Sequence, residues 1–338
     1  LYLALLLLGP VTVVPASNDA NGASAVENVR SEIGRFAGEF TDIHFVWLDG
    51  HDFKADLRTL SLALGEGHEL MDYQHHADQV EALNALNLDR IKMMLSYDSP
   101  SSSLYRTGKN VEHDKAFVVV LTLNADVFMG DSSASTSYIY NVDREALPRI
   151  VGQSRIDNIT YLRSVVRHEI AHAIKAYLFT GHAFTHQPLG GEYNSYVSEI
   201  WADLFTALME KRFGSGDMGF INNLMDARTI NLAKSFDIQH YTSPAVGHGL
   251  AADLSSVSDL HDLAQLVERE YLKVKPSYQE YEELAIAACH LHYALQDTPP
   301  GKEQELESID YCEFAEPDAD MLVKLRAEAE SAMARVFR

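Results

Sequence analysis

The sequence predicts an α+β fold, with a sheet-containing N-terminal part followed by a series of helices. Two short apolar segments rich in β-branched and aromatic residues, at 43–48 and 116–128, are typical of strands. After residue 157 the apolar residues recur at helical spacing instead. With 338 residues, 46% of them hydrophobic, the chain can bury one large core or two smaller ones.

The first 25 residues are predicted to be a signal-peptide-like segment. Residues 1–14 are uncharged and almost all apolar, and a polar run with small residues at Ala16 and Ala25 follows. This apolar stretch is too short to span a bilayer comfortably, and small residues after it are typical of a cleavage site. We therefore expect an exported protein without stable membrane association after removal of the segment. A buried N-terminal strand or helix is the alternative.

Residues 26–157 are predicted to form a mixed α/β N-terminal part. Its first strand, at 43–48, is followed by an Asp-Gly pair that favours a turn. We expect four further elements: an amphipathic helix at 73–95, a loop at 96–110, the longest strand at 116–128 and a partner strand at 135–142.

Residues 158–275 are predicted to be a helical part, and residues 276–338 a set of C-terminal helices with an acidic loop. Ser277 and Glu280 form a capping-box pattern at the start of one of these helices. The acidic run at 297–320 has no EF-hand spacing, so it predicts a solvated loop. The expected helices are 160–179, 198–213, 218–234, 243–254, 259–273, 277–296 and 319–337.

The charge of the chain argues against an anionic partner. Asp and Glu total 49 against 27 Lys and Arg, which gives a formal net charge of -22. Such a surface is unsuited to nucleic acid or to an anionic bilayer. Net charge also keeps exported proteins in solution. The two cysteines, Cys289 and Cys312, are consistent with one disulfide or with two buried thiols.

The most informative residues form an H-E-x-x-H motif, His168-Glu169-Ile170-Ala171-His172, within the predicted helix 160–179. Four helical residues turn by about 400°, so both imidazoles lie on one face, roughly 6 Å apart, and can reach one ion. Glu169 would then lie beside the metal, where a carboxylate can take a proton from an activated water. An accidental match on an exposed helix is the alternative, but apolar residues on both sides of the motif predict a buried helix.

A catalytic zinc site needs a third protein ligand and an open fourth position. Glu199 follows His172 by 27 positions and lies four residues before Asp203 in the next predicted helix. This spacing lets Glu199 bind the metal while Asp203 accepts the ring N–H of a ligand histidine. Alternative third ligands in the intervening loop are His182, His186 and Glu192.

These two segments together resemble the gluzincin zinc metallopeptidases, which include thermolysin-like and aminopeptidase N-like enzymes. The matching residues are HEIAH at 168–172 and EIWAD at 199–203. The resemblance implies a zincin-like fold with an edge strand, one Zn²⁺ per chain, Glu199 as third ligand and Asp203 behind the ligands. The metzincin pattern is absent, because it requires a third histidine where Leu178 stands.

A weaker similarity concerns the oxyanion of the transition state. The segment 235–254 is similar to the part of aminopeptidase N-like enzymes in which a tyrosine just before a helix stabilises this charge, and Tyr241 has the matching place. The alternative is an ordinary core tyrosine. Other candidates for the role are His248, Tyr193 and Tyr196. The motif by which those enzymes recognise a free α-amine is missing.

Together these observations predict an exported zinc-dependent metallopeptidase with Glu169 as general base. Its expected partner is a peptide or protein substrate, which the strand at 116–128 or at 135–142 would bind by β-pairing. Two alternatives come from other classes: a catalytically inactive secreted binding or scaffold protein on a zincin fold, and a metal-independent interaction domain whose motif is accidental.

Overall fold

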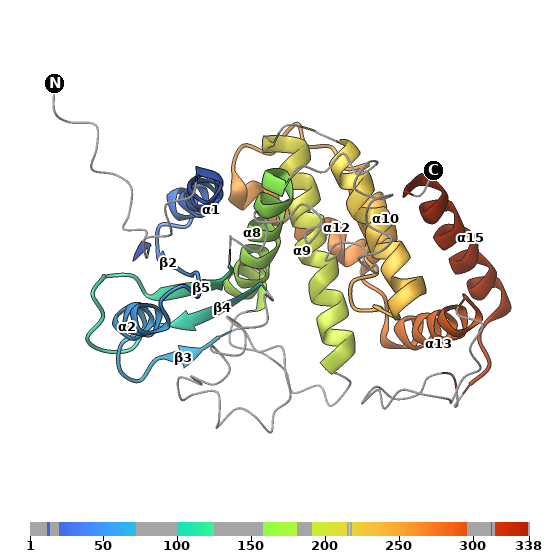
Figure 1. Cartoon of the computed structure of the whole chain (residues 1–338), viewed down its shortest axis with the longest axis horizontal. Helices are drawn as coiled ribbons and strands as arrows, with labels where there is room; N and C mark the ends of the chain where they lie inside the picture. Colours follow the sequence, from blue (N-terminus) through green and yellow to red (C-terminus); the bar gives the residue numbers. More distant parts are fainter. Residues whose placement is uncertain are drawn as a thin grey trace. The chain divides into compact units, whose positions relative to one another are not determined.

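A computed structural model describes residues 12–13, 20–71, 100–124, 158–180, 191–214, 216, 218–295, 312 and 315–336. These residues form a mixed α and β structure, which confirms the predicted α+β class (Figure 1). The chain divides into two compact units, each of which combines distant segments. The first contains Leu1–Ser132, Asp157–Gly191 and Leu254–Leu266, and the second contains Ser133–Ile156, Glu192–Asp253 and Val267–Arg338. The four parts predicted from the sequence stay a prediction.

The first unit contains a five-stranded sheet with the order β1-β2-β5-β4-β3. Its parallel part joins β1, β2 and β5, whereas β4 runs antiparallel to both β5 and β3. The strands are β1 (Thr12–Val13), β2 (Ile43–Leu48), β3 (Glu69–Leu70), β4 (Ser101–Arg106) and β5 (Phe117–Thr122). The strands predicted at 43–48 and 116–128 are confirmed, the second over a shorter range.

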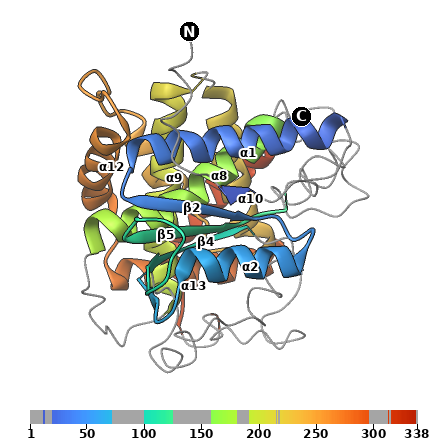
Figure 2. The same ribbon diagram turned by 90° about the vertical axis from the view of Figure 1, so that its left-hand side faces the viewer.

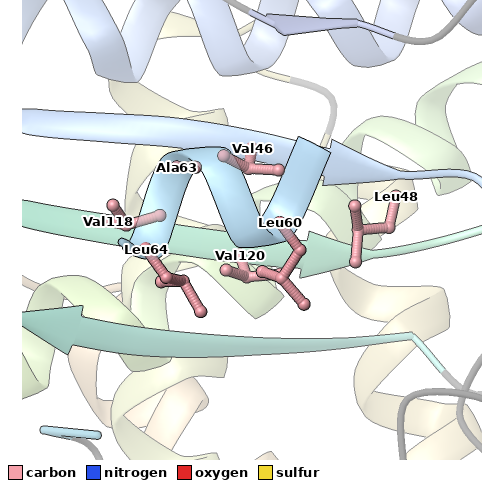
Figure 3. Packing of buried hydrophobic residues seen from close by; sticks show 7 residues of the cluster. All are labelled: Val46, Leu48, Leu60, Ala63, Leu64, Val118 and Val120. Carbon is pink, nitrogen blue, oxygen red and sulfur yellow. The ribbon is translucent and has the colours of Figure 1, made fainter. Parts of the chain in front are cut away.

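Helices cover both faces of this sheet (Figure 2). Helix α2 (Phe53–Leu64) packs Leu60, Ala63 and Leu64 against alternate residues of β2 and β5, which form the core shown in Figure 3. Helices α1 (Ala20–Glu39) and α8 (Asn158–Lys175) lie on the opposite face, where Phe36 of α1 contacts Phe45 of β2. Burial on both faces explains why β2 and β5 are nearly continuous apolar runs, interrupted by the buried His44 and Thr122.

The loop predicted at 96–110 is wrong in part, because Ser101–Arg106 forms β4. The serines of this strand gave no strand signal, and β4 forms because its main chain pairs with the apolar β5 from Ser101 to Arg106. The helix predicted at 73–95 and the strand predicted at 135–142 lie outside the described residues.

Carboxylates hold the turn that joins β2 to α2. Asp49 Oδ1 accepts a hydrogen bond from His51 N, and Asp56 Oδ2 accepts one from Gly50 N, both at 3.0 Å. Asp52 caps the N-terminus of α2 by accepting from Lys54 N. Asp49 and Asp56 are buried, and burial together with the charge of Asp49 raises the pKa of Asp56 to about 6.

The second unit is helical where the structure describes it. Helices α10 (Met218–Ser235), α13 (Tyr278–Leu295) and α15 (Ala319–Val336) pack against one another (Figure 1). Arg335 of α15 forms an ion pair with Asp226 of α10 at 2.6 Å, and a disulfide joins Cys289 of α13 to Cys312. The disulfide resolves the choice that the sequence left open.

Most predicted helices are confirmed, with shifts at their ends. Helix α9 (Gly191–Phe213) begins seven residues before the predicted start, and α11 (Ser243–Gly249) ends earlier than expected. Helix α12 (Leu260–Val274) matches its prediction, and α8 continues into a π-helical turn at Ala176–Thr180. The capping box is formed, since Glu280 N donates to Ser277 Oγ and Ser277 N to Glu280 Oε2.

No described helix is long and apolar enough to cross a membrane.

Strand β1 lies within the predicted signal segment, and helix α1 begins within it. Strand β1 pairs with β2 in parallel, with Thr12 opposite Val46 and Val13 opposite Trp47. Helix α1 begins at Ala20. The export of the chain stays a prediction.

Candidate metal centre

The two motif histidines face each other on α8. The Nε2 atoms of His168 and His172 are 3.2 Å apart, and the ring planes are nearly perpendicular at 85°. Two nitrogens bound to one zinc at 2.0–2.1 Å and at the tetrahedral angle would be about 3.3 Å apart. The spacing of the imidazole pair therefore fits two ligands of a single ion.

Two contacts within the first unit fix the turn of α8 that carries the motif. Arg167 donates two hydrogen bonds to Glu32 of α1, Nε to Oε2 at 2.9 Å and Nη2 to Oε1 at 2.8 Å, and both side chains are buried. On the sheet side, Ser102 Oγ of β4 donates to the main-chain oxygen of Glu169 at 2.5 Å. The residues on both sides of His168 are thus held by polar contacts to neighbouring elements.

Glu169 is half-buried and follows His168 directly along α8. Successive side chains leave a helix about 100° apart, so its carboxylate lies beside the face that carries the imidazoles. This is the arrangement expected of a base that adjoins a metal without binding it.

Glu199 of α9 belongs to a charged group in the second unit. The other members of this charged group are Asp203, Arg228, Asp237 and His240. The side chain of Glu199 is 13% exposed, and its Oε2 lies 3.6 Å from Nε2 of His240. The other ring nitrogen of His240, Nδ1, is 2.7 Å from Oδ1 of Asp237. Because a carboxylate only accepts, Nδ1 carries the proton in this bond. Burial lowers the pKa of His240, but the charges of Glu199 and Asp237 outweigh it and leave the pKa above its usual value.

Asp203 lies one turn after Glu199 on α9 and is buried. It accepts hydrogen bonds from Arg228 Nε and Nη2, both at 3.2 Å, and from Thr242 Oγ1 at 2.5 Å. These bonds join α9 to α10 and to the start of α11. The predicted bond from a ligand histidine to Asp203 stays a prediction.

The three predicted ligands come together in the structure. One nitrogen each of His168 and His172 and a carboxylate oxygen of Glu199 all lie within 4.8 Å of one another. No other group of three or more His, Cys, Asp or Glu side chains among the described residues is close enough to hold an ion. Of the alternative third ligands, Glu192 is not in this group, and His182 and His186 lie outside the described residues.

The donor set suits zinc. Imidazole nitrogens and a single carboxylate oxygen are typical zinc ligands, and three of them leave one tetrahedral position for water or substrate. Calcium and magnesium prefer oxygen ligands alone, so two imidazoles argue against those ions.

The hydroxyl of Tyr241, which lies just before α11, has a hydrogen-bond partner in α15. The residue is buried, and its hydroxyl donates to Glu328 of α15. Burial, with the bond to Glu328, raises the pKa of Tyr241 above its usual value. A donor role toward an oxyanion would require this bond to break. Among the other candidates, Tyr193 donates to Pro276 O, Tyr196 is buried, and His248 lies 3.6 Å from Glu270.

Sequence reasoning missed three members of the charged group. No role was predicted for His240, Asp237 and Arg228. His240 lies close to Glu199, Asp237 bonds to His240, and Arg228 pairs with Asp203. The spacing of Asp237 and His240, three residues apart just before the predicted helix at 243–254, was the available signal. It is weak, because such pairs also occur in ordinary turns.

Comparisons with protein-family models, curated proteins and solved structures found no match to this chain. The resemblance to the gluzincins is therefore carried by the short motifs at 168–172 and 199–203. Function has to be inferred from the chemistry of the site itself.

Proposed function

We propose that this chain is a zinc metallopeptidase of zincin-like fold that binds one Zn²⁺ through His168, His172 and Glu199. The observation that carries the proposal is the convergence of these three ligand atoms within 4.8 Å, with the imidazole nitrogens at the spacing zinc requires. When bound, zinc would lower the pKa of a water molecule and polarise the carbonyl of the substrate.

Glu169 is the proposed general base. Its carboxylate leaves α8 next to the ligand face, so it can accept a proton from the attacking water and pass it to the amine that leaves. A catalytically inactive binding protein has no need of a carboxylate at this position. Glu169 therefore supports a catalytic function over that alternative.

His240 is the residue that the geometry favours for stabilising the negative charge of the transition state. Asp237 holds its Nδ1–H, which leaves Nε2 directed toward the Glu199 side of the group. A protonated imidazole there would donate to a developing oxyanion. Tyr241 stays the prediction from resemblance, but its hydroxyl is already engaged by Glu328.

An extended peptide is the proposed substrate, with the Ser102 end of β4 as the strand that pairs with it, because among the described residues the pairing with the β3 side covers Leu104–Arg106. The strand at 116–128 is excluded from this role because β5 lies inside the sheet, between β2 and β4 over its whole length. Strand β4 packs beside α8, and Ser102 bonds to the general-base residue. Peptide recognition by strand addition needs such a strand next to the reacting groups.

An exported location is proposed with the function. The disulfide between Cys289 and Cys312 supports it, because structural disulfides persist mainly in oxidising compartments. The apolar N-terminal stretch and the net charge of -22 agree with export.

The decisive experiment replaces Glu169 by Gln and measures both metal content and peptide hydrolysis. We expect the wild-type protein to contain about one zinc per chain by mass spectrometry and to lose activity in a chelator. Glu169→Gln should keep the zinc and lose at least about a hundredfold in turnover. Glu330→Gln, an exposed glutamate of α15, is the matched control and should behave as wild type.

Two outcomes would contradict the proposal in different ways. A chain that binds zinc but hydrolyses no peptide in a broad protease assay would be the inactive binding protein. A purified chain with no affinity for zinc would make the motif accidental. Retained activity in Glu169→Gln would remove this residue from the role of base.

A further inference from the structure

A serine of the sheet is bonded to the main chain of the proposed base. Ser102 Oγ donates to the carbonyl oxygen of Glu169 at 2.5 Å, across 67 positions of the sequence and within the first unit. The carbonyl already belongs to the hydrogen-bond ladder of α8, and its second lone pair can accept this additional bond. Strand β4 is thereby joined to the turn of α8 that carries the metal-binding motif.

The alternation of side chains along β4 explains why Ser102 makes this contact. Ser103 lies opposite Val120, which packs under α2 on the other face of the sheet. Neighbouring residues of a strand point to opposite faces, so Ser102 points toward α8. Its two serine neighbours do not share this orientation, and Ser101 bonds instead to Thr122 of β5.

The main-chain N–H and C=O of Ser102 point to the side of β4 that faces away from β5. Met71 N donates to Leu104 O, which shows that the N–H and C=O of Leu104 point away from β5 toward β3. Residues two apart in an antiparallel strand point their main-chain groups the same way, so those of Ser102 also point away from β5. Within the described residues, pairing on that side of β4 reaches Leu104 and goes no further toward Ser102.

We infer that Ser102 is a positioning residue, whose hydroxyl sets the spacing between Glu169 and the strand that receives an extended peptide. The inference rests on the proposed metallopeptidase function. The main chain of Ser102 would pair with the substrate, while its side chain bonds to the helix that carries the base. Loss of the hydroxyl would therefore let the bound peptide and the base shift relative to each other.

The test compares Ser102→Ala, Ser102→Thr and Ser103→Ala as full-length, zinc-loaded proteins. The substrates are a long fluorogenic peptide, which can pair with β4, and a short one that spans only the cleaved bond. For Ser102→Ala we expect kcat on the long peptide to fall by about three- to tenfold, the range that one hydrogen bond accounts for, with KM changed less. The short peptide should be cleaved at nearly the wild-type rate.

Two variants distinguish positioning from a general loss of structure. Ser102→Thr keeps the hydroxyl and should restore most of the kcat on the long peptide. Ser103→Ala removes a hydroxyl from the α2 face of the same strand and should leave both substrates unaffected. Zinc content and the midpoint of thermal unfolding should be the same in Ser102→Ala and Ser103→Ala.

Three results would overturn the inference. An unchanged kcat of Ser102→Ala on the long peptide, in an active wild-type background, would refute the role of Ser102 alone. Equal losses on both peptides would show a merely structural effect. A wild-type protein that neither binds zinc nor cleaves either peptide would refute the proposed function, and this inference with it.

Discussion

The two compact units differ in the electrostatic surroundings of the predicted ligand residues that each of them contains. In the first unit, the imidazoles of His168 and His172 lie on a helix whose buried arginine, Arg167, is paired with Glu32. In the second unit, three carboxylates share one arginine, because Arg228 faces Asp203, Glu199 and Asp237. The comparison teaches that the helical unit carries an excess of negative charge around its ligand, which a divalent cation would offset.

The largest expected effect comes from removing either Arg167, which is buried, or Arg228, which is half-buried but pairs with the buried Asp203. Arg167→Met leaves the buried Glu32 without its bidentate partner, and Arg228→Met does the same to Asp203. Each change should lower the free energy of unfolding by about 3–5 kcal/mol. The two tryptophans allow each unit to be followed in urea, since Trp47 lies in the first unit and Trp201 in the second.

Double replacements sharpen this contrast. Arg167→Met with Glu32→Leu removes both partners and should recover most of the lost stability. Arg228→Met with Asp203→Leu should recover less, because Glu199 and Asp237 then share His240 as their remaining partner. Equal recovery in the two units would contradict the charge difference on which the comparison depends.

A smaller effect is expected from the disulfide, which lies in the second unit alone. Cys289 and Cys312 are 23 positions apart, and closing a loop of this size stabilises a fold by about 3 kcal/mol. Replacing both by Ser should therefore lower the stability reported by Trp201. The signal of Trp47 should change little, and a shift of the same size in both signals would show that the units unfold together.

The smallest expected change in the free energy of unfolding comes from replacing Asp56, a buried acid of the first unit, and it is an increase. Folding raises the pKa of Asp56 from 3.8 to about 6, so the folded state binds the proton more tightly than the unfolded state. Stability from this group is present below about pH 4 and is lost as the pH rises through about 6. Asp56→Asn should therefore raise the free energy of unfolding by about 1–3 kcal/mol at about pH 7.5, with little change at low pH.

Urea unfolding at several pH values checks this prediction. Asp114→Asn, which changes an exposed aspartate of the same unit, is the control and should not alter the pH dependence. A wild-type profile that Asp56→Asn leaves unchanged would show that Asp56 is ionised in the folded protein throughout this range.

The sequence predicts those parts of the fold that have their own pattern of apolar residues. Strands β2 and β5 are recognisable because both faces are buried, and α8 and α9 because their apolar residues recur at helical spacing. Strand β4 escaped prediction because its serines are polar and its conformation comes from pairing with β5. Local pattern carries no information about such a partner.

The residues of the candidate site likewise differ in whether a local sequence pattern predicts them. His168, Glu169 and His172 are fixed by spacing within one helix, and Glu199 by its place four residues before Asp203. His240 could not be assigned from sequence, because its proximity to Glu199 depends on how segments 41 positions apart pack. The partner of Tyr241 is 87 positions further along the chain, in α15.

The disulfide also decides what happens when the chain is cut. A protease that cleaves anywhere between Cys289 and Cys312 severs the main chain, but the sulfur bridge keeps the last helix attached. Glu328 and Arg335 would then stay at a high local concentration near Tyr241 and Asp226, and their contacts would re-form after each opening. A nicked molecule should migrate as one band without a reductant and as two bands with it.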